Sequence, residues 1–148
     1  TSDARFKKNV KENIPGLSFV NKLRPVSYNF DTKKMSKILQ NESAANTAKD
    51  KLVYTGFIAQ EVEKAAADLG FDFSGVKVPE NEKQAYGLRY AEFVVPLVQA
   101  VKELSAKNAK QEKLISANAE VITSYESRLL EMEKKMELLL QPKNMAKN

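Results

Sequence analysis

The feature that most constrains this chain is a seam of apolar and amide residues near its C-terminal end. Its members recur at alternating steps of four and three, which is the heptad spacing of a coiled coil. With Val101 at heptad position a, the register holds over about six heptads without a stutter. The seam consists of Leu97, Val101, Leu104, Asn108, Gln111, Ile115, Asn118, Ile122, Tyr125, Leu129, Met132, Met136 and Leu139. No Gly or Pro interrupts it before Pro142, so the sequence predicts one long helix.

A helix with such a seam packs either on its own domain or on other copies of itself. Packing within the chain would need a matching surface of equal length, and the rest of the chain is too small to offer one. Charges beside the seam indicate the orientation of the copies. Lys107 at g faces Glu112 at e of a parallel neighbour, and Arg128 faces Glu133 in the same way. The sequence therefore favours parallel helices from identical chains.

The seam residues also bear on the number of helices. Ile115 and Ile122 at a, without a clean run of Leu at d, do not favour a two-stranded zipper, so we rank a trimer ahead of a dimer. The amide layers at Asn108, Gln111 and Asn118 weaken the seam but penalise slipped registers.

Residues 1–92 carry a different pattern, typical of a small α+β unit. The expected elements are a short helix or strand at 17–23, strands at 26–30 and 52–58, a helix at 59–69 and an extended stretch at 71–78. Residues 31–51 are polar and predict a projecting loop, with one helical turn near Met35. The expected fold is thus α+β: a small globular part with short strands and helices, followed by a long C-terminal helix (93–148) that forms a parallel trimeric coiled coil and frays after residue 141.

The residue types that the chain lacks restrict its chemistry. It contains no His, no Cys and no Trp. A Ser-His-Asp triad, a Cys-His pair, a Cys/His zinc site and a disulfide framework are therefore excluded. Covalent catalysis would need a nucleophile such as Ser, with a base such as a desolvated Lys amine. We expect no metal and no cofactor.

The net charge is modest, at +5 from 24 basic and 19 acidic residues. The excess lies towards the N-terminal end, where Phe6 and Phe19 interleave with Lys7, Lys8, Lys11, Lys22 and Arg24. Such a group can contact nucleic acid, but no recognition motif accompanies it, so we do not expect a nucleic-acid partner. No apolar run approaches the roughly 18–20 residues that span a bilayer, and we expect no membrane partner either.

Four short blocks, taken in order, resemble one known family. Residues 2–10 resemble its pattern S-D-x-R-x-K-x-N-I, and residues 23–28 its L-x-P-V-x-Y. Residues 56–62 resemble G-F-I-A-Q-E-V, and residues 86–104 resemble Y-x-x-L-x-P-L-x-x-A-I-x-E-L. The family is the C-terminal intramolecular chaperone domain of phage tailspikes and tail fibres, first described for endosialidases and classed with self-cleaving serine peptidases. A membrane-tethered eukaryotic transcription factor family shares the pattern.

The resemblance implies a function for the N-terminal block. Family members trimerise, assist folding of the upstream fibre, and then cut themselves off before the Ser of the motif. Carried over, Ser2 is the nucleophile, Lys7 the general base with an amine kept neutral by burial, and Thr1–Ser2 the cleaved bond. The supporting motif residues are Asp3, Arg5 and Asn9, and we expect Asp3 and Arg5 to have a structural pairing.

The resemblance also implies partners and a location. The partners are two further copies of the chain and the upstream fibre or tailspike domain of the same polypeptide, which the loop at 31–51 would touch. The location is the host cytoplasm during virion assembly, or the virion tail where the domain is not cleaved. Two alternatives stay open: a structural trimerisation cap that never cuts, and a basic oligomer that contacts DNA.

Overall fold

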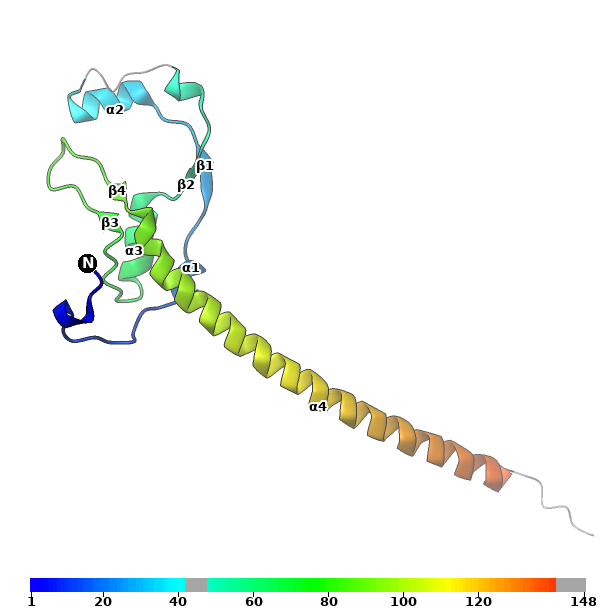
Figure 1. Ribbon diagram of the computed structural model, residues 1–148. Coiled ribbons are helices and arrows are strands. Elements are labelled where there is room, and N and C mark those ends of the chain that lie inside the picture. Colours follow the sequence, from blue (N-terminus) through cyan, green and yellow to red (C-terminus); the bar gives the residue numbers. More distant parts are fainter. Residues whose placement is uncertain (42–47, 141–148) are drawn as a thin grey trace, which may run out of the picture. The chain divides into compact units, whose positions relative to one another are not determined.

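The computed structural model describes residues 1–41 and 48–140 (Figure 1). By its internal packing the chain divides into two units, Thr1–Leu104 and Ser105–Asn148. The elements in chain order are η1 (Ala4–Phe6), α1 (Leu17–Val20), β1 (Val26–Tyr28), α2 (Thr32–Leu39), η3 (Lys49–Lys51), β2 (Tyr54–Gly56), α3 (Ala59–Ala67), β3 (Val76–Lys77), β4 (Gly87–Leu88), η4 (Tyr90–Phe93) and α4 (Val94–Leu140). This confirms a small α+β unit with a long C-terminal helix. The frayed tail expected after residue 141 lies outside the described residues.

The strands form two short antiparallel pairs. β1 pairs with β2 in the register Val26↔Gly56, and β3 pairs with β4 (Figure 1). The first pair is shorter than the strands expected at 26–30 and 52–58. Just beyond its end, the Asn29 side-chain amide donates to the Leu52 carbonyl at 2.8 Å. That carbonyl is thus satisfied by a side chain instead of another ladder bond.

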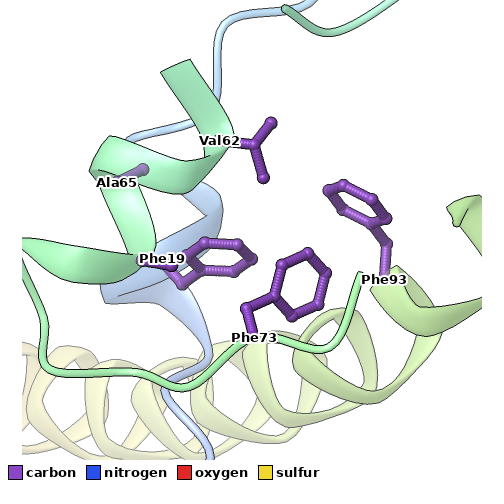
Figure 2. Close-up of a cluster of buried hydrophobic side chains, with 6 residues drawn as sticks. Phe19, Val62, Ala65, Phe73 and Phe93 are labelled. Carbon is purple, nitrogen blue, oxygen red and sulfur yellow. The ribbon is translucent and has the colours of Figure 1, made fainter. Parts of the chain in front are cut away.

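The core of the first unit is aromatic. Val62, Ala65 and Ala66 form the inner face of α3, at the i, i+3 and i+4 spacing of an amphipathic helix. They pack with Phe19, Phe73 and Phe93, which come from three distant segments (Figure 2). The Phe73 ring lies 5.0 Å from that of Phe19 and 4.8 Å from that of Phe93, in tilted and edge-on arrangements.

The segment predicted as a loop at 31–51 contains more helix than the single turn expected near Met35. Helix α2 begins at Thr32 because the Asp31 carboxylate caps it, accepting from the Lys34 N–H at 2.9 Å. The fully buried Thr32 is held further by its backbone N–H, which donates to the Asp50 carboxylate at 3.0 Å. Residues 42–47 of this segment lie outside the described residues.

Helix α4 spans 47 residues. Pro96 lies in its first turn, where no backbone N–H is lost from the hydrogen-bond ladder. Pro96 and Ala100 are its buried residues, and they pack within the first unit. Every seam residue from Leu97 to Leu139 lies on α4 with an exposed side chain in the single chain. Across residues 1–41 and 48–140, no helix combines the length and the apolar character needed to cross a bilayer.

Candidate functional site

The N-terminal block forms a short 3₁₀ turn. Asp3 caps this turn, and its carboxylate accepts from the Arg5 backbone N–H at 2.9 Å. The same carboxylate binds the Arg5 guanidinium through two nitrogens, Nε at 3.0 Å and Nη2 at 2.6 Å. The Arg5 charge lowers the pKa of Asp3 from its ordinary value, chiefly through this hydrogen bond. With both side chains ionised, this two-nitrogen contact between Arg5 and Asp3 stabilises the turn.

Ser2 and Lys7 flank that turn. Ser2 immediately precedes the capping residue, and the Lys7 backbone N–H closes the turn by donating to the Ala4 carbonyl at 3.1 Å. A 3₁₀ turn shortens the chain relative to an extended one, so it draws the two residues towards each other. Both side chains are exposed in the single chain. The burial expected for the Lys7 amine is therefore not provided by the isolated chain.

Asn9 has a left-handed backbone, with a φ of 53°. Among residues with a side chain, Asn and Asp tolerate this region best. The Asn of the motif thus has a conformational reason: it redirects the chain directly after the turn. Its side chain is exposed.

After this block the chain is anchored to α4. The buried Gly16 lies so close to the helix that a Cβ there would be 2.6 Å from the Ala100 backbone N. The next N–H, that of Leu17, donates to the Glu103 carboxylate at 2.9 Å, and Gln99 donates to the other oxygen at 3.1 Å. Sequence reasoning did not single out Glu103. The sequence feature that could have pointed to Glu103 is its position in the fourth block, whose pattern includes this Glu.

The other blocks also meet one another. Arg24 of the second block forms an ion pair with Glu61 of the third, in the first turn of α3. This guanidinium lowers the pKa of Glu61 from its ordinary value. Tyr90 of the fourth block accepts a hydrogen bond from the Phe57 N–H at 3.2 Å. A side chain at Gly56 would collide with that hydroxyl, which explains the Gly of the third block.

Two of the basic residues considered for nucleic-acid contact have acidic partners. Arg24 pairs with Glu61, and Lys22 lies 3.5 Å from the Asp68 carboxylate. Within the part of the chain that the structure describes, no group of three or more acidic side chains is placed to hold a metal ion. The described residues thus form ion pairs and anchoring contacts within the α+β unit, and the N-terminal turn is exposed.

The fold and the meeting of the blocks define a small α+β domain. The family model described as chaperone of endosialidase, a peptidase family, matches residues 2–71, and this part of the chain is similar to that family. The resemblance seen in the sequence is thereby confirmed over these residues. Neither the curated proteins nor the solved structures yielded a match. This match supports a role as an intramolecular chaperone in tail-fibre folding.

Proposed function

We propose that this chain is an intramolecular chaperone that trimerises, assists folding of an upstream tail fibre or tailspike, and then releases itself by cutting before Ser2. The observation that carries the proposal is the family match, which begins at Ser2 itself. The work would take place in the host cytoplasm during virion assembly, and an uncut domain would remain on the virion tail.

The exposed side chains of α4 support the trimer. Leu114 and Val121 lie at g positions, beside the seam, and are 61% and 51% exposed. They widen the apolar face beyond the a and d positions that a two-stranded zipper covers. A third helix would cover this additional surface, because each helix then has two neighbours.

The cleavage step would proceed as an acyl transfer. The Ser2 hydroxyl attacks the Thr1 carbonyl carbon while the neutral Lys7 amine takes the hydroxyl proton. The C–N bond of the peptide breaks, the protonated amine returns a proton to the leaving nitrogen, and Thr1 is left as an ester on Ser2 Oγ. Water then hydrolyses the ester, giving an upstream chain that ends at Thr1 and a domain that begins at Ser2.

The exposure of Lys7 has a consequence for timing. The proposed base needs a desolvated amine, whereas the isolated chain leaves the Lys7 side chain exposed to solvent, so the isolated chain would not activate Ser2. We therefore propose that neighbouring chains bury Lys7, which makes cleavage depend on assembly. The same exposure favours a second candidate, a structural trimerisation cap that stays attached.

Mass spectrometry of a fusion that carries upstream fibre sequence separates the two candidates. The unsubstituted fusion is expected to split between Thr1 and Ser2, whereas Ser2→Ala and Lys7→Ala remain full length. Lys8→Ala, which changes the adjacent exposed lysine, is the matched control and should still split. If the unsubstituted fusion stays full length and sediments as a trimer, the self-cleaving candidate fails and the trimerisation cap is the remaining candidate.

A further inference from the structure

The first unit has an apolar surface pocket beside the beginning of α4. Its volume is about 240 Å³, and none of its lining residues is charged. The lining includes Phe19, Val20, Phe57, Phe93, Pro96 and Leu97. Phe19 and Pro96 form buried walls, whereas Leu97 is 46% exposed at the margin. The pocket is thus shaped and lined for an apolar side chain.

The pocket lies on one side of the seam. In the heptad register, Phe93 falls at g, Pro96 at c and Leu97 at d, and these positions are adjacent around a helix. The opposite side of the seam, at e and b, carries Val98 and Val95. Each of these two valines is 55% exposed. The start of α4 therefore has an apolar hollow on its g side and apolar side chains on its e side.

A parallel assembly brings these two sides together. A residue at g meets the residue at e five positions later on the neighbouring helix. The partner of Phe93 is then Val98 of the next chain. We infer that Val98 of each chain enters the pocket of its neighbour, with Val95 covering the margin. The inference rests on the proposed trimer, in which three such contacts close into a ring.

The contact gives the first units a means of association that the seam does not supply. The seam joins the helices, whereas the Val98 contact joins the α+β unit of one chain to the helix of the next. Each chain contributes a side chain to one neighbour and a pocket to the other, so the contact is heterologous. Such contacts form a closed ring when the chains are related by a rotation axis. The occupant is accordingly a second copy of this chain.

Cross-linking offers a direct test, because the chain has no Cys. The full chain carrying Val20→Cys and Val98→Cys is oxidised and run on a non-reducing gel, beside ultracentrifugation of the reduced sample. Covalent dimers and trimers are expected. Val53→Cys with Val98→Cys is the matched control, since Val53 is 70% exposed outside the pocket, and it should stay monomeric on the gel.

The outcomes separate the inference from the proposed function. Trimers in the ultracentrifuge without covalent products would overturn the contact and leave the trimer intact. Monomers in the ultracentrifuge would overturn both. As a second readout, Val98→Asp should raise the concentration at which trimers dissociate roughly tenfold or more, because a carboxylate would be buried in an apolar pocket. Val53→Asp should leave that concentration unchanged, and an equal effect of both variants would also overturn the contact.

Discussion

The carboxylate of Glu103 accepts a hydrogen bond from the backbone N–H of Leu17, across 86 positions of sequence. The contact is partly buried and satisfies a donor at the start of α1 that has no partner within its own helix. Glu103 thereby connects α4 to the segment that follows the Ser2–Lys7 block.

Removing this acceptor should weaken the first unit. Glu103→Ala is expected to lower the free energy of unfolding by about 1–2 kcal/mol, because a partly buried N–H loses a charged partner. Urea denaturation at one fixed chain concentration measures this, since association also contributes to stability. Glu103→Gln keeps an acceptor and should lose less than half as much. Equal losses for the two variants would contradict the hydrogen-bond role.

The close approach of Gly16 to α4 predicts intolerance of any side chain. Gly16→Ala places a methyl group 2.6 Å from the Ala100 backbone N and 2.8 Å from the Gln99 carbonyl carbon. Displacing the helix backbone should cost about 1–3 kcal/mol. Gly87→Ala is the control, because its Cβ would meet only Lys77 Cβ, at an ordinary 3.7 Å. Thermal unfolding that ranks Gly87→Ala below Gly16→Ala would refute the packing argument.

The Arg24–Glu61 pair predicts a dependence of stability on pH. Because Arg24 lowers the pKa of Glu61 below its ordinary value of 4.5, folding favours the ionised carboxyl. This contribution is complete above pH 4.5 and is lost as the pH falls through the lower folded-state pKa. Arg24→Gln should therefore reduce the difference in urea midpoint between pH 7 and pH 3. Both side chains are partly exposed, so high salt should have the same effect. Lys8→Gln, at an exposed lysine of the N-terminal segment, should leave the pH difference as it is.

The left-handed backbone of Asn9 predicts a distinction between substitutions. Asn9→Gly should cleave like the parent, because Gly adopts this region freely. Asn9→Val should cleave roughly tenfold more slowly, since the left-handed conformation costs a β-branched residue about 1–2 kcal/mol. Time courses of the fusion followed by mass spectrometry provide the rates. Lys8→Val, at a residue with negative φ, should cleave at close to the parental rate. If Asn9→Val cleaves at the same rate as Lys8→Val, the backbone argument fails.

Regular patterns predicted the helices better than the strands. The long helix was expected from the spacing of its seam, and the α3 helix from the pattern of residues 59–69, because periodicity is encoded locally. The strand limits depended on contacts with distant residues. Asn29 replaces a ladder bond with a side-chain bond to Leu52, and this partner choice does not follow from the local pattern. The Asp31 cap of α2 is a local signal, but the prediction of a loop did not use it.

The candidate site divides in the same way. Ser2 and Lys7 were predicted from a motif, and the structure places them on either side of one turn. Their roles and the trimer stay predictions. Glu103 was not foreseen, because its partner is a backbone N–H 86 positions away and carries no side-chain signature. Tyr90 and Gly56 likewise required the fold, since their proximity depends on how β2 and η4 meet.

The first turns of α4 have one side that is buried in the chain's own fold and another side that is exposed. Ala100 is buried in the fold of the single chain, whereas Val101 and Leu104 are exposed and face partner chains in the proposed trimer. A substitution on one side therefore need not alter the other. Selection could strengthen or weaken the association of chains while leaving the folding of each chain unchanged. One scaffold could then serve fibres whose chains must associate with different affinities.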